Sequence, residues 1–239
     1  MYITGAVGSS DYGEAFTFDY DLPNDTVYGE TCASIGLIFW ARRMLEVEPG
    51  SEYADVMELA LFNTCLSGMS LDGKKFFYVN PLEVNPEACR KDQLKKHVEY
   101  ERQPWFECAC CPPNLARLIS SLGSYAVTAN DSVMYLHLYV GGRMKNPQNG
   151  MALRIESGLP WDSVVEITVE DCRKETYELA FRMPGWADGV RILLNGEAQT
   201  KFTDVDGYIH FQREWTPGDV VKLVFDMPVR INRANPSVK

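Results

Sequence analysis

The feature that most constrains this chain is a change in the spacing of its apolar residues. Between about residues 31 and 125 they recur every three to four positions, which is typical of amphipathic helices. Beyond Asn130 they alternate with polar residues over short runs, which is typical of half-buried strands. The pattern predicts an α+β chain with a helical domain over residues 1–129 and a β-sandwich domain over residues 130–239.

Three stretches carry the helical spacing. In the first, Ile35, Ile38, Phe39 and Leu45 fall near one face of the expected helix. The second begins at Ser51, whose hydroxyl suits a helix N-cap. The third follows two adjacent prolines, which a first helical turn tolerates. These segments read ASIGLIFWARRMLEV, SEYADVMELALFNTCLSGMS and PPNLARLISSLGSYAV.

The alternating half contains seven candidate strands and three strong turn signals. The strands read SVMYLHLYV, ALRIES, VVEITVE, YELAFRM, VRILLN, YIHFQR and VVKLVFDM. The turn signals are Pro184-Gly185, Asn195-Gly196 and Pro217-Gly218. Short strands at this spacing predict an antiparallel sandwich.

Composition narrows the class of protein and its partners. The chain has 239 residues, 46% of them hydrophobic, which is enough for one large domain or two ordinary ones. The net charge is −10 and the basic residues are scattered, so we expect neither nucleic acid nor a membrane surface as a partner. The first residues lack the layout of a signal peptide, and we expect a cytoplasmic protein whose seven cysteines are reduced.

The segment GEAFTFDYDLPND fits neither half. In an extended conformation Glu14, Phe16, Phe18 and Tyr20 would share one face. A carboxyl beside three aromatic rings would have its pKa raised by desolvation, as a general acid requires. The alternative is a carboxyl at the wet edge of a strand.

The segments CACCPP and YGETC together predict a metal site. Cys110 and Cys111 immediately precede a helix whose dipole favours thiolates, the form that binds zinc. Glu30 and Cys32 are two residues apart in what we expect to be an extended segment ahead of a helix, and they would complete a tetrahedron. The same spacing also fits buried structural thiols, a vicinal disulfide or a redox pair.

These motifs resemble a known family. The stretches YITGAVGSSDYGEAFTFDYDLPNDTVYGETCASIG, CACCPPNLAR and RMPGWADG are similar to the β-L-arabinofuranosidases of glycoside hydrolase family 127, and the likeness covers essentially the whole chain. The resemblance implies an (α/α)6 barrel followed by β-sandwich domains. It also implies an L-arabinofuranoside-containing oligosaccharide or glycoconjugate as substrate.

The resemblance assigns a role to each candidate residue. It implies a zinc ion held by Glu30, Cys32, Cys110 and Cys111, with Cys110 as nucleophile and Glu14 as general acid/base. It places sugar contacts at Glu58 and Tyr78. The implied chemistry is a retaining hydrolysis in which a thiolate replaces the usual attacking carboxylate.

The length of the chain departs from the family. An (α/α)6 barrel has twelve helices, whereas the sequence predicts three or four, so we expect an interior fragment whose barrel is incomplete and whose exposed helix faces favour self-association. Activity of the isolated chain does not follow from the resemblance.

Two other functions fit the residues. A conventional glycosidase would use Glu14 and Glu30 as its two carboxylates, with purely structural thiols. A non-catalytic, zinc-stabilised module would bind carbohydrate on Trp161, Trp186 and Trp215, although core packing is the simpler expectation for each of these rings.

Overall fold

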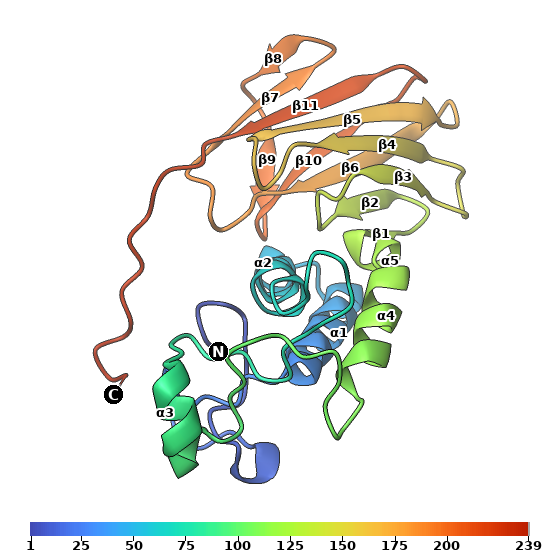
Figure 1. Cartoon of the computed structure of the whole chain (residues 1–239). Coiled ribbons are helices and arrows are strands. Elements are labelled where there is room, and N and C mark those ends of the chain that lie inside the picture. Colours follow the sequence, from blue (N-terminus) through green and yellow to red (C-terminus); the bar gives the residue numbers. More distant parts are fainter. Residues whose placement is uncertain (239) are drawn as a thin grey trace. The chain divides into compact units, whose positions relative to one another are not determined.

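The computed structural model describes residues 1–238 and separates them into two compact units. The first unit comprises Met1–Ala41, Val56–Ser120 and the tail from Ile231, and the second comprises Arg42–Asp55 and Ser121–Arg230. Helices dominate the first unit and strands the second, as Figure 1 shows. The chain is therefore α+β, as predicted.

Helices lie in all three stretches that have helical apolar spacing, and a further short helix at Pro86–Lys91 was not predicted. The buried side chains of the first helix include Ile35, Ile38 and Leu45, as expected, while Phe39 is half-buried. No helix among the described residues has the length and apolar character needed to cross a membrane. The elements are α1 (Thr31–Val47), α2 (Ser51–Ala60) continued by a π-helical segment (Leu61–Leu66), α3 (Pro86–Lys91), α4 (Cys111–Ser120) and α5 (Gly123–Ala126), with 3-10 turns at Tyr12–Glu14 and Gln93–Lys95.

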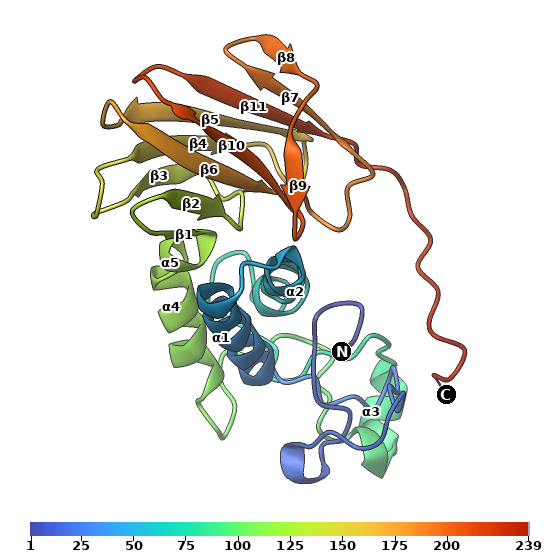
Figure 2. The same cartoon turned by 180° about the vertical axis from the view of Figure 1, so that it is seen from behind.

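Two sheets form the second unit. A five-stranded sheet has the order β1-β2-β6-β10-β9, and a six-stranded sheet has the order β3-β4-β5-β11-β7-β8. Figure 2 shows them from behind. The strands are β1 (Val127–Ala129), β2 (Val133–Leu136), β3 (Gly142–Lys145), β4 (Ala152–Ser157), β5 (Val164–Asp171), β6 (Thr176–Arg182), β7 (Val190–Leu194), β8 (Glu197–Gln199), β9 (Thr203–Val205), β10 (Tyr208–Glu214) and β11 (Val220–Phe225).

Inward-facing residues of both sheets make one apolar core. Leu179 and Phe181 on β6 belong to the same cluster as Ile167 on β5 and Leu223 on β11, and all four are essentially inaccessible to water. Burial alternates along β5 and β11, as the period of two requires. The seven predicted strands are all present.

The sandwich differs from the prediction in two ways. β2 pairs with β6 in parallel, whereas all the other strand pairs are antiparallel. Four strands of three or four residues, β1, β3, β8 and β9, were not predicted because such short segments show no measurable alternation.

The helical segment expected to reach Ala129 ends at Ala126, and the next three residues form β1.

Two hairpins turn on residues with positive φ. Asn195 and Gly196 have φ values of 52° and 86° between β7 and β8, and Asp206 and Gly207 have 51° and 74° between β9 and β10. Both pairs match the type I′ turn, whose twist suits adjoining antiparallel strands.

The expected strand at GEAFTFDYDLPND is absent. Gly13, Glu14 and Tyr20 all have positive φ, which an extended strand cannot contain. Residues Tyr12–Glu14 form a 3-10 turn instead, and the rings of Phe16 and Phe18 are exposed. The prediction that three aromatic rings bury Glu14 is therefore wrong.

The three tryptophans of the sandwich do not form a platform of exposed rings. Trp215 is buried and donates its indole N–H to the carbonyl of Tyr177, while Trp186 packs edge-on against Phe225. Trp161 is 94% exposed between β4 and β5, so the expectation of core packing is wrong for this ring.

Candidate metal centre and active site

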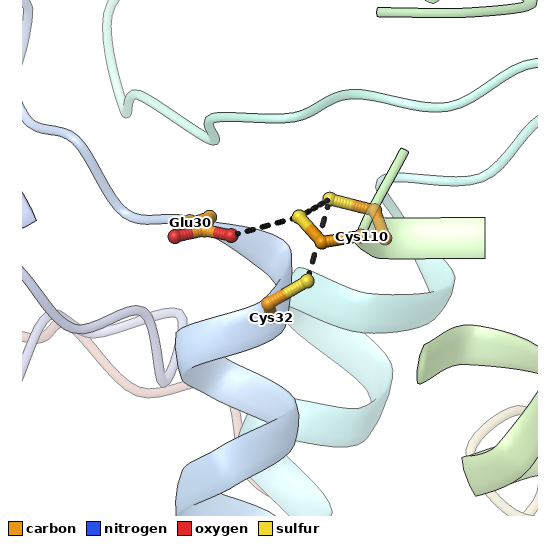
Figure 3. A group of neighbouring side chains, drawn as sticks. Glu30, Cys32 and Cys110 are labelled. Carbon is orange, nitrogen blue, oxygen red and sulfur yellow. Dashed lines mark hydrogen bonds between the residues drawn. The ribbon is translucent and has the colours of Figure 1, made fainter. Parts of the chain in front are cut away.

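Four potential metal ligands converge at the beginnings of two helices. Glu30 and Cys32 come from the start of α1, and Cys110 and Cys111 come from the start of α4. One ligand atom from each residue lies within 4.8 Å of all the others. Figure 3 shows the labelled side chains of Glu30, Cys32 and Cys110 pointing toward one another.

Helix geometry explains how neighbouring residues reach one point. The Glu30 carbonyl accepts from the Ser34 amide at 3.1 Å, which makes Glu30 the N-cap of α1. The Cys110 carbonyl accepts from the Asn114 amide at 3.3 Å, so Cys110 stands in the same position on α4. Cys32 lies in the first turn of α1 and not in an extended segment, which corrects the prediction. Both helix dipoles direct partial positive charge at the cluster and favour anionic ligands.

The spacing of the donor atoms fits a tetrahedral ion. Zinc–sulfur bonds of about 2.3 Å place sulfurs about 3.8 Å apart, and a carboxylate oxygen at about 2.0 Å lies about 3.5 Å from each sulfur. Cys32 Sγ is 3.6 Å from Cys111 Sγ, and Cys110 Sγ is 3.8 Å from Cys111 Sγ. Cys110 Sγ is 3.3 Å from Glu30 Oε1.

The pKa values of the three thiols also favour a cation at this site. The hydrogen bond with Cys111, more than any other contact, lowers the pKa of Cys32 to about 7. Burial raises the pKa of Cys110 to about 12, and the contact with Cys32 raises that of Cys111. Without a cation Cys32 is the thiol that ionises most readily, and further negative charge at this separation is unfavourable. A divalent cation would allow all three to ionise.

Tyr78 lies beside Cys110, and its position follows from backbone pairing. The segment before α1 forms an isolated bridge between Glu30 and Val79, and the Thr31 amide donates to the Tyr78 carbonyl at 2.9 Å. This pairing brings the Tyr78 hydroxyl 3.3 Å from Cys110 Sγ. Of the two predicted sugar contacts, Tyr78 therefore lies at the cluster.

Glu14 reaches the same region from the N-terminal loop. Its Oε1 accepts a hydrogen bond from the Tyr28 hydroxyl at 2.9 Å, and the Tyr28 ring meets the Tyr78 ring edge-on at a centroid distance of 6.2 Å. A cavity of about 540 Å³ is lined by Glu14, Glu30 and Cys32, together with residues of α1 as far as Trp40.

Some predicted residues are not brought together, and others were missed. Glu58 lies half-buried on α2 and belongs to neither the cluster nor the cavity, and Cys110 does not line this cavity. Tyr28 and Asn114, which contact Glu14 and Cys32, were not identified from the sequence. The sequence hints at these contacts only by proximity, since Tyr28 is two residues before Glu30 and Asn114 is four residues after Cys110.

Comparison with known proteins supplies the family. The model described as "Beta-L-arabinofuranosidase, GH127 catalytic domain" matches residues 1–124, and the model described as "GH127 middle domain" matches residues 133–227. A non-reducing end β-L-arabinofuranosidase of Bifidobacterium longum subsp. longum is 40% identical over the whole chain. The chain spans 37% of that relative's length.

Solved structures agree with the family models. A GH127 β-L-arabinofuranosidase from Geobacillus stearothermophilus T6 matches the whole chain at 52% identity with a TM-score of 0.93. A second GH127 β-arabinofuranosidase matches at 34% identity with a TM-score of 0.88, and in each case the chain covers 38% of the other protein. The chain is thus homologous to glycosidases that it matches over little more than a third of their length, and it belongs to glycoside hydrolase family 127.

Proposed function

We propose that this chain carries the metal ligands, nucleophile and acid/base of a zinc-dependent retaining β-L-arabinofuranosidase. The observation that carries the proposal is the four-donor cluster, in which three donor separations of 3.6, 3.8 and 3.3 Å are close to those around a tetrahedral ion. The family relationship supports L-arabinofuranosides as the substrate class, in an oligosaccharide or a glycoconjugate.

Three thiolates and a carboxylate suit zinc better than calcium or magnesium, which prefer oxygen ligands. Zinc would be held by Glu30, Cys32, Cys110 and Cys111, and when bound it would keep the thiols deprotonated at neutral pH. The helices of the first unit would form part of an (α/α)6 barrel, the rest of which this chain does not supply.

Hydrolysis would proceed in two displacements. The Cys110 thiolate attacks the anomeric carbon while the Glu14 carboxyl gives its proton to the departing glycosidic oxygen. A carbon–sulfur bond forms as the glycosidic bond breaks. The Glu14 carboxylate then takes a proton from water, whose oxygen attacks the same carbon and returns the bonding electrons to sulfur. Two inversions retain the anomeric configuration.

The Tyr28 hydroxyl supports this role of Glu14. It donates to Oε1 at 2.9 Å, which fixes one carboxyl oxygen and leaves the other for the proton transfer. Glu14 is exposed in this chain, so the burial beside aromatic rings that the sequence predicted is absent here.

Metal content and covalent trapping test the proposal. The purified chain is expected to hold about one zinc ion, which Cys32→Ser and Cys110→Ser lose and Cys172→Ser, in the sandwich, retains. Acid quenching during turnover of an aryl β-L-arabinofuranoside should leave one anhydropentose mass on the peptide that contains Cys110. If Cys110→Ser hydrolyses the glycoside as fast as the parent, a two-carboxylate mechanism replaces this one.

A further inference from the structure

Cys32 has a contact that the other two sulfurs of the cluster lack. The Asn114 side-chain amide nitrogen lies 3.1 Å from Cys32 Sγ and donates a hydrogen bond to it. Asn114 is three residues after Cys111 on α4, so both side chains project from the same face of that helix toward α1. Cys32 is thus held from α4 by a sulfur at 3.6 Å and an amide at 3.1 Å.

The orientation of this amide is determined by its other partner. Arg117 Nη2 donates to Asn114 Oδ1 at 2.7 Å. A guanidinium has donors only, so the oxygen of the amide must face Arg117 and the NH₂ group must face Cys32. The Arg117 guanidinium in turn lies over the Phe39 ring of α1, at 4.7 Å from its centroid. The amide therefore presents a donor to the sulfur and cannot present its acceptor.

Cys32 and Cys110 have different hydrogen-bonding partners. Hydrogen bonds to a charged form favour that form, so the amide stabilises thiolate at Cys32. Cys110 contacts the Tyr78 hydroxyl and the Glu30 carboxylate instead, and no amide of the described residues donates to its sulfur.

We propose that Asn114 is a positioning residue that orients the Cys32 sulfur for metal binding. The inference rests on the proposed function, because it concerns the same cluster. It adds a residue outside the four-donor set that would fix the position of one of the ligands, Cys32. The relay from Phe39 through Arg117 to Asn114 would hold the Cys32 sulfur at its position between the two helices.

Metal affinity and a cobalt spectrum test the inference without requiring hydrolysis. Asn114→Ala removes the donor, Asn114→Asp replaces it with a negatively charged acceptor, and Arg117→Ala frees the amide to rotate. Asn63→Ala is the matched control, since Asn63 is an exposed helical asparagine whose amide donates to the Leu59 carbonyl one turn earlier. Zinc affinity is measured by chelator competition, and the sulfur-to-metal charge-transfer band is recorded with Co²⁺.

Loss of an orienting hydrogen bond to a metal ligand costs about 10- to 100-fold in affinity. We expect Asn114→Ala to bind zinc about 10-fold more weakly, Asn114→Asp still more weakly, and Arg117→Ala to fall between Asn114→Ala and the parent. The cobalt band of Asn114→Ala should move to lower energy, because a thiolate without its hydrogen bond is a better electron donor. A purely structural role would not move this band.

The outcomes separate the inference from the proposed function. If the parent binds zinc and Asn114→Ala matches Asn63→Ala in affinity and spectrum, the inference is wrong and the proposed metal site stands. If Asn114→Ala fails to fold, Arg117→Ala decides: unchanged affinity and spectrum refute the inference, and weakened binding with a shifted band supports it. If the parent chain binds no zinc, the proposed metal site fails and the inference fails with it.

Discussion

Lowering the pH from 7.5 to 5.0 should destabilise the sandwich by about 2 kcal/mol through one buried side chain, His137. This imidazole is inaccessible to water, with Nδ1 2.6 Å from the Tyr208 hydroxyl and Nε2 2.7 Å from the Thr128 hydroxyl. Burial, and to a lesser extent the nearby charges of Arg42 and Arg182, lowers the pKa of His137 from 6.5 to about 3.

The sign follows from where the proton binds. Between pH 6.5 and pH 3 the unfolded chain holds a proton on His137 that the folded chain does not, so acid favours unfolding. Each pH unit below 6.5 costs about 1.36 kcal/mol, and pH 5.0 lies 1.5 units below, which gives about 2 kcal/mol. Above pH 6.5 the histidine is neutral in both states and contributes no slope.

Urea unfolding followed by tryptophan fluorescence at several pH values measures this effect. Carboxylates also titrate in this range, so the relevant quantity is the difference in slope between the parent and His137→Gln. The variant should be less stable at pH 7.5 because the hydroxyls of Tyr208 and Thr128 lose a partner, yet it should lose about 2 kcal/mol less on acidification. Equal pH slopes in the two proteins would refute the assignment of a neutral buried histidine.

Two further predictions concern the second unit. Asp55→Ala should lower the free energy of unfolding by about 3 kcal/mol, because Arg182 is fully buried and its Nη1 lies 2.6 Å from Asp55 Oδ1. Urea unfolding measures this loss, and a value below about 1 kcal/mol would contradict the prediction. Gly207→Ala should destabilise the chain by about 1–3 kcal/mol more than Gly196→Ala, as thermal melting would show. Both positions have positive φ, but an added Cβ lies 2.0 Å from Ser51 Oγ at Gly207 and meets nothing at Gly196, so equal losses would refute the clash.

The strands and the convergence of the four candidate ligands were predictable for different reasons. Alternation over five or more residues marks a strand wherever one face is buried, and β5, β6 and β11 lie where the pattern places them. β1 and β8 are too short to alternate measurably. The cluster was predictable because the helix starts and the pairs Glu30/Cys32 and Cys110/Cys111 are local features of the sequence.

The failures arise where tertiary contacts or single dihedrals decide the structure. Alternation suggested a strand through Glu14, but positive φ at Gly13 and Glu14 breaks it. Asn114 could not be assigned to Cys32 because the two meet only when α4 packs beside α1. Parallel pairing of β2 with β6 is likewise a non-local choice that strand patterns do not encode.

Metal binding and hydrolysis should be separable in this chain, because the donors and the sugar pocket depend on different parts of the protein. All four donors, and the Asn114 amide that contacts one of them, belong to the first compact unit and come from two helix starts. Their convergence needs only α1, α4 and the short backbone pairing beside Glu30. A sugar pocket needs walls on several sides, and Glu14 remains exposed here although Tyr28 holds it. If the chain binds zinc tightly but does not hydrolyse glycoside, this result would support the metal centre. The lack of hydrolysis would then be attributed to an incomplete sugar pocket.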